Sequence, residues 1–119
     1  MEVIKIINKT ELTRVRPEDV LYLKAAGNYT HMVLRTGREF KFTRQIKEFN
    51  AIFQQLEDNP FLRVGRSLIV NKSFIFQVNA TDQHIILAGN GLNTEVTLTA
   101  FREPILELMK QLTNEGGQQ

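Results

Sequence analysis

The sequence contains no cysteine and no tryptophan. Without cysteine the chain has no disulfide framework, no thiolate nucleophile and no sulfur-based zinc or iron–sulfur site, and this composition fits a reducing compartment. No apolar run approaches the roughly 20 residues that a membrane span needs, and residues 1–7 lack the apolar stretch of a signal peptide. We therefore expect a cytoplasmic protein that does not enter the membrane.

Residue patterns that carry catalysis or metal binding are also missing. The two histidines, His31 and His84, fall on separate predicted strands, without a second imidazole at metal-ligand spacing. The glycines at 89 and 91 lack the Lys-Ser/Thr ending of a phosphate loop, and neither Ser67 nor Ser73 stands in a glycine-framed elbow. We expect no catalytic residues, no metal and no cofactor, and hence no enzyme.

The 119 residues, 42% of them hydrophobic, suffice for one compact core. No repeat, low-complexity block or internal linker divides the chain. We expect a single domain over residues 1–113 and a polar, disordered tail over residues 114–119.

Short β-prone segments separated by turn residues dominate the sequence and predict a mainly β fold with two short helices, built from small antiparallel sheets. Apolar residues three or four apart predict the first helix, with Thr43 as its N-cap and Asn59-Pro60 beyond its end. A second amphipathic helix is predicted near the end, with Pro104 in its first turn. The predicted strands are residues 3–7, 20–25, 29–34, 39–42, 61–70, 74–78, 84–88 and 93–98, and the predicted helices are residues 46–56 and 105–112.

Positive charge is concentrated in the first part of the chain. Residues 1–72 hold 13 of the 15 Lys and Arg residues but 8 of the 13 Asp and Glu residues. Within this part, residues 35–47 carry five positive side chains and one negative side chain. Such a local field attracts polyanions, although a solvated protein surface would show the same charges.

Two basic segments also contain side chains suited to reading bases. Residues 27–31 read Gly-Asn-Tyr-Thr-His between two apolar strands, which predicts a loop tip. Arg63 and Arg66 precede an aliphatic run that we expect to anchor in the core. Arginine matches guanine, and asparagine matches adenine, through paired hydrogen bonds in the major groove, so Arg66 and Asn28 are candidates for sequence readout. The two arginines would equally protect an exposed strand edge from pairing.

The same residues resemble a known family. Residues 20–30, Val-Leu-Tyr-Leu-Lys-Ala-Ala-Gly-Asn-Tyr-Thr, look like the opening of the LytTR DNA-binding domain, and residues 61–72 are similar to its Phe-x-Arg-x-His-Arg-Ser-Tyr-Ile-Val-Asn signature. The resemblance covers about residues 2–112. Three positions depart from the family pattern: Gly65 replaces histidine, Lys24 replaces glutamate, and residues 97–100 lack a proline and an arginine.

The resemblance implies a bacterial transcription regulator of the response-regulator type, used in two-component systems. In this family, loops of an elongated β fold enter successive major grooves of promoter DNA, often as paired copies on repeated elements and often after a receiver domain. The base-contacting residues implied here are Asn28, Tyr29, Thr30, His31, Arg66 and Arg102. Charge and proximity in the sequence add phosphate-contacting candidates, although Asn71 equally suits a turn: Lys41, Arg44, Arg63, Ser67, Asn71 and Lys72.

Two other functions fit the same residues. An RNA-binding β module would use the same basic loops, with Tyr29 stacking on unpaired bases. A protein-interaction or sensory module would use its basic face to bind an acidic partner. Sequence-specific binding to double-stranded DNA, in competition with single-stranded RNA, separates these functions.

Overall fold

The computed structural model describes residues 2–89 and 91–115 of the chain. Within these residues the chain forms ten β-strands, two α-helices and two short 3-10 helices. In chain order these are β1 (Ile4–Ile7), β2 (Leu12–Val15), η1 (Pro17–Asp19), β3 (Val20–Ala26), β4 (Tyr29–Leu34), β5 (Glu39–Phe42), α1 (Ile46–Gln54), β6 (Phe61–Val64), β7 (Leu68–Asn71), η2 (Lys72–Phe74), β8 (Ile75–Asn79), β9 (His84–Leu87), β10 (Val96–Thr99) and α2 (Arg102–Asn114).

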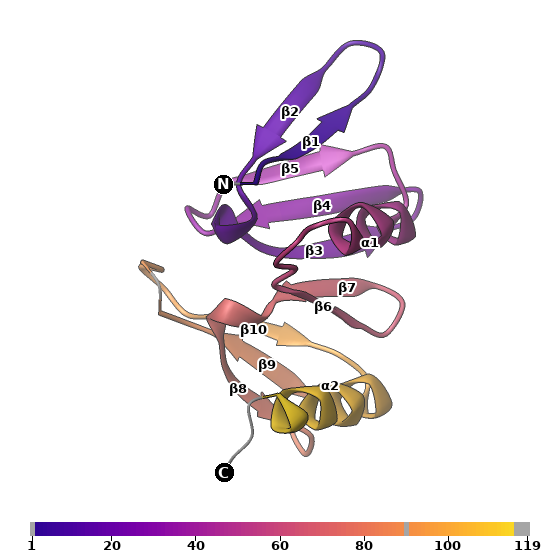
Figure 1. The fold of residues 1–119 in the computed structure, drawn as a ribbon. Coiled ribbons are helices and arrows are strands. Elements are labelled where there is room, and N and C mark those ends of the chain that lie inside the picture. Colours follow the sequence, from indigo (N-terminus) through magenta and orange to yellow (C-terminus); the bar gives the residue numbers. More distant parts are fainter. Residues whose placement is uncertain (1, 90, 116–119) are drawn as a thin grey trace.

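The strands form three antiparallel sheets arranged along an elongated body that measures 45 × 32 × 28 Å (Figure 1). A central five-stranded sheet has the order β5-β4-β3-β7-β6, a three-stranded sheet has the order β10-β9-β8, and β1 pairs only with β2. This architecture confirms the predicted fold of small antiparallel sheets with two helices.

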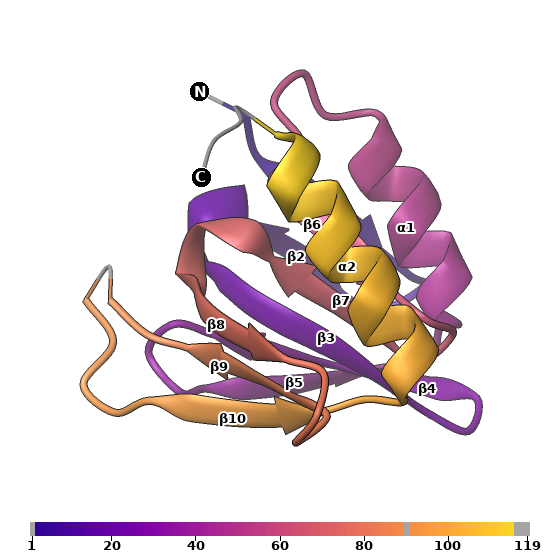
Figure 2. The ribbon, with the colours of Figure 1, turned by 90° about the horizontal axis from the view of Figure 1, so that it is seen from below.

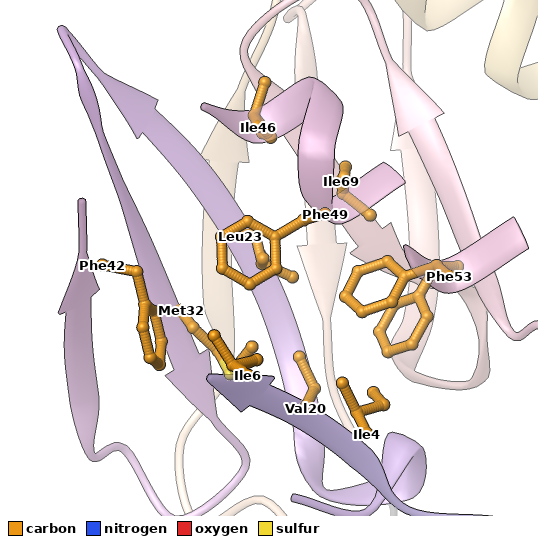
Figure 3. Close-up of a cluster of buried hydrophobic side chains, with 11 residues drawn as sticks. Ile4, Ile6, Val20, Leu23, Met32, Phe42, Ile46, Phe49, Phe53 and Ile69 are labelled. Atoms are coloured by element: carbon orange, nitrogen blue, oxygen red, sulfur yellow. The ribbon is translucent and has the colours of Figure 1, made fainter. Parts of the chain in front are cut away.

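One face of the central sheet packs against α1 and β1. Phe49 and Phe53 of α1 are fully buried, and the ring of Phe53 stacks on Phe61 with 4.1 Å between centroids. Figure 3 shows Phe49 and Phe53 together with Leu23 of the sheet and the isoleucines of β1 in this cluster. Burying each large apolar side chain stabilises the fold by roughly 1.5–3 kcal/mol, so this cluster fixes the orientation of the strands beneath α1.

The opposite face of the central sheet packs against the three-stranded sheet and α2. Leu68 and Val70 of β7 meet Ile85 and Leu87 of β9 in this second cluster, and Leu108 of α2 closes it. Helix α2 contacts both β6 and β8, which are edge strands of the two sheets. One cluster covers each face of β7, so the strand is buried on both faces. This explains its uninterrupted aliphatic sequence.

Several boundaries differ from the sequence-based expectation. The predicted strand at residues 61–70 is two strands, because Gly65 has a φ of +64° and reverses the chain there. Helix α1 begins after Gln45 and not after Thr43; the backbone N–H of Gln45 donates to the Glu48 carboxylate at 3.1 Å. Strand β2 was not predicted.

The second helix is longer than predicted. Helix α2 begins at Arg102 and runs to Asn114, so the expected disordered tail does not begin at residue 114. The Lys72 Nζ lies 3.0 Å from a carboxylate oxygen of Glu115, the residue that follows the helix. The last residues of the expected tail, 116–119, lie outside the described residues, as does Asn90 of the predicted loop at residues 89–91.

Candidate nucleic-acid interface

Strand direction brings several connections to one end of the molecule. Strand β3 runs antiparallel to both β4 and β7, with Lys24 opposite His31 on one side and opposite Leu68 on the other. The β3–β4 turn, the β6–β7 turn and the chain leaving β5 therefore lie at the same end of the strands of the central sheet. Figures 1 and 2 show the connection from β10 to α2 at this same end. We call this end the turn edge.

The β3–β4 turn consists of two residues, Gly27 and Asn28. Gly27 has a φ of +63°, which glycine adopts without the steric cost that a side chain adds, and which two-residue hairpins require. Asn28 is exposed at the tip of the turn. Its amide can therefore donate and accept hydrogen bonds to an external group.

The β6–β7 turn presents Arg66. Buried Val64 and Leu68 anchor the two strands on either side of it. The Arg63 guanidinium reaches back and donates from Nη2 to the Arg66 carbonyl oxygen at 3.0 Å, while its Nε is buried. Because the backbone of the turn is held in this way, the exposed Arg66 side chain projects from a fixed base.

An open groove of about 1140 Å³ runs between the β6–β7 turn, the β8–β9 turn and the start of α2. Arg66 and Arg102 line it together with Lys24, and Asp82 and Glu103 are its two acidic residues. Arg102 is exposed at the first position of α2. The groove thus brings two predicted base-contacting residues, 36 positions apart in the sequence, to one place.

A row of basic side chains crosses the adjoining face of the central sheet. Lys24 of β3, His31 of β4 and Lys41 of β5 are paired in register. The ammonium group of Lys41 lies 4.5 Å from the ring centroid of Tyr29, a cation–π distance. The Nδ1 of His31 lies 3.3 Å from a Glu39 carboxylate oxygen, so one acid faces this row.

Two predicted contact residues are buried and bind their own backbone, which corrects the sequence-based expectation. Thr30 is 0% exposed and its hydroxyl donates to the Arg44 carbonyl oxygen at 2.7 Å. Asn71 is also 0% exposed, and its Nδ2 donates to the carbonyl oxygens of Pro17 and Val20. Neither side chain is available to DNA at the surface.

The other predicted residues differ in position and freedom. Lys72 lies at the opposite end of β7 from Arg66, and its Nζ pairs with Glu115. Arg44 lies at the turn edge, but its Nη2 donates to the Ile7 carbonyl oxygen at 2.7 Å and so also holds β1. Ser67 is exposed in the β6–β7 turn.

Two residues of this surface were missed by the sequence reasoning. Lys24 was noted only as a departure from the family pattern, although alternation along β3 places it on the face opposite buried Leu23. Phe101, between β10 and α2, is 82% exposed and lines the groove. No pattern in the sequence distinguished this phenylalanine from those in the core.

The described residues contain no group of three or more His, Cys, Asp or Glu side chains placed to hold a metal ion. His31 and His84 lie in different sheets, and His84 faces the Gln77 side chain at 3.3 Å. Over residues 2–89 and 91–115, neither helix has the length and apolar character that crossing a membrane demands.

Exposed turns on a β scaffold gather basic and amide side chains at one end, an arrangement that suits a nucleic-acid-binding domain. The sequence matches the LytTr DNA-binding domain family over residues 10–112, and the chain belongs to that family. The family is one of DNA-binding domains, and it is not a known enzyme family.

A solved structure shows the same fold. It is the LytTr DNA-binding domain of a protein described as a methyl-accepting/DNA response regulator from Bacillus cereus, with a TM-score of 0.64 and 20% sequence identity. The similarity covers 94% of this chain and 97% of that one. No curated protein matches the sequence.

Proposed function

We propose that this chain is a sequence-specific, double-stranded DNA-binding domain of a bacterial transcription regulator, and that DNA docks on the turn edge. The observation that carries the proposal is that three exposed side chains meet at this end of the molecule: Asn28 in the β3–β4 turn, Arg66 in the β6–β7 turn and Arg102 at the first position of α2. Amide and guanidinium groups held on rigid turns suit the hydrogen-bonding pattern of base edges in the major groove.

The proposed base contacts are Asn28, Tyr29, His31, Arg66 and Arg102. Cations and hydroxyls around them provide phosphate contacts, which set the register on the duplex and the salt dependence of binding. The proposed phosphate contacts are Lys24, Lys41, Arg44, Arg63 and Ser67.

We further propose that paired copies bind repeated promoter elements, and that the chain acts in the cytoplasm together with a receiver domain of a two-component system. Pairing of copies follows from the family likeness. Within one copy, successive loops along the 45 Å body can reach successive grooves of one duplex. The response regulator from Bacillus cereus named above supports the second point by likeness of fold.

The test begins with selection of bound duplexes from a random-sequence pool. On the selected duplex, Arg66→Ala is expected to weaken binding by about 1–3 kcal/mol, or roughly 5- to 150-fold, with little change on a scrambled duplex. Arg38→Ala is the matched control, since Arg38 is exposed in the β4–β5 connection at the opposite end of the sheet. Equal loss on both duplexes, or tighter binding to single-stranded RNA, contradicts the proposal.

A further inference from the structure

Among the described residues, Phe101 is the most exposed large apolar side chain, with 82% of its surface open to solvent. Its backbone has a structural function, because the Phe101 carbonyl oxygen accepts from the Ile105 N–H at 3.2 Å at the start of α2. Its ring takes no part in either buried cluster. The side chain is therefore held in water by a fixed backbone and adds nothing to the core.

Three cations and two acids line the groove beside this ring. Phe101 precedes Arg102 and lines the same groove as Arg66 and Lys24. A lone exposed phenylalanine needs no special explanation on most surfaces. Here it lines a groove together with Lys24, Arg66 and Arg102. The cations attract a polyanion, and the ring would then meet an apolar group of that polyanion.

We propose that the Phe101 ring packs on the C5-methyl group of one thymine in the major groove, beside the base contacted by Arg102. This inference rests on the proposed function. In the major groove the thymine methyl is the one apolar group that a base pair presents, and phenylalanine is among the side chains that contact it. Phe101 thus adds an apolar criterion to the hydrogen bonds made by the arginines.

Uracil scanning of the selected duplex tests the methyl contact directly. Each thymine is replaced in turn by deoxyuridine, which removes the methyl group and keeps the base pair. For the wild-type chain we expect a loss of about fourfold at one thymine, the size expected from burying one such group. Phe101→Ala is expected to bind the thymine duplex more weakly and to respond equally to thymine and uracil at that position.

Phe76→Ala provides the matched control. Phe76 is 70% exposed on β8 and does not line the groove, so its removal is expected to leave the uracil pattern unchanged. Thermal unfolding checks that both variants fold. We expect that they do, because both phenylalanine side chains are exposed.

The outcomes separate this proposal from the function on which it rests. If the wild-type chain prefers the selected duplex but no thymine responds to uracil, the methyl contact is wrong and sequence-specific binding stands. If Phe101→Ala keeps the wild-type uracil pattern, the methyl contact is again wrong. If selection yields no preferred duplex, the proposed function itself fails.

Discussion

Asn71 gives the sharpest test of how the fold joins β7 to β3 at the end of the central sheet opposite the turn edge. Its side chain is fully buried at the end of β7. The Nδ2 donates to the carbonyl oxygens of Pro17 at 3.2 Å and Val20 at 2.9 Å, and the Oδ1 accepts from the Ser73 N–H at 3.0 Å. This one amide thus ties β7 to the start of β3 and to η2.

The magnitude follows from these three bonds. Each contributes about 1 kcal/mol net, and a buried group that loses its partner costs more, so Asn71→Ala should lower the free energy of unfolding by about 3 kcal/mol. Asn71→Asp keeps the acceptor for Ser73 but turns an oxygen toward two carbonyl oxygens. The charged form is repelled there, whereas the protonated form can still donate one bond.

The pH dependence of Asn71→Asp has a definite sign. The folded state raises the pKa of the new carboxyl above its unfolded value of about 3.9, so the folded state binds the proton more tightly. Relative to wild type, the variant should be least destabilised below about pH 4. Its deficit should grow as the pH rises through the folded pKa, because the unfolded chain gives up the proton more readily.

Urea unfolding at pH 4 and pH 7 measures both effects as differences from wild type. Asn8→Asp is the matched control: Asn8 is exposed and its side-chain oxygen accepts from the N–H groups of Thr10 and Glu11, a role that a carboxylate keeps. The reasoning is refuted if Asn71→Asp matches this control at both pH values, or if Asn71→Ala loses less than about 1 kcal/mol.

Three further predictions address the turn edge and its surroundings. Gly65→Ala should lower stability by about 1–2 kcal/mol, because φ is +64° and a Cβ there would lie 3.1 Å from Pro104 Cγ; an unchanged melting temperature contradicts this. Burial raises the pKa of the Tyr22 hydroxyl above its ordinary value of 10.0, and the negative charge of Glu39 adds to this effect. The folded form therefore loses stability as the pH rises beyond that value. In Tyr22→Phe the free energy of unfolding should fall less steeply between pH 9 and pH 11 than in wild type. The same slope in both proteins would contradict this prediction. Lys41→Ala should reduce the salt dependence of DNA binding by roughly one unit, whereas Lys72→Ala should leave it unchanged; equal slopes for the two variants would remove the distinction between the two ends.

Local patterns in the sequence predicted most elements of the fold. The three- and four-residue spacing of Ile46, Phe49 and Phe53 predicted α1, because burial of one helical face selects that period. Strand β2 was missed because all of its residues are exposed or half-buried and it pairs only with β1. The reversal at Gly65 was hidden within a long β-prone segment, where the strands on both sides are apolar.

The candidate site was predicted only in part, because side-chain direction depends on the register of the sheet. Tyr29 and His31 face outward on β4, so alternation turns Thr30 between them into the core. Asn71 ends a strand that is buried on both faces, and its polarity alone suggested a surface position. The groove that gathers Arg66 with Arg102 depends on the packing of α2 against β6, which no local pattern reveals.

Docking of DNA on the turn edge can be measured directly, because the chain contains no cysteine of its own. A single cysteine is introduced by Thr81→Cys in the β8–β9 turn, which lines the groove, or by Thr36→Cys in the β4–β5 connection at the opposite end of the central sheet. An iron–EDTA probe on each thiol cleaves DNA that lies nearby. We expect localised cleavage of the selected duplex from the Thr81→Cys position and none from the Thr36→Cys position. Cleavage from the Thr36→Cys position alone, or equally from both, would contradict the claim.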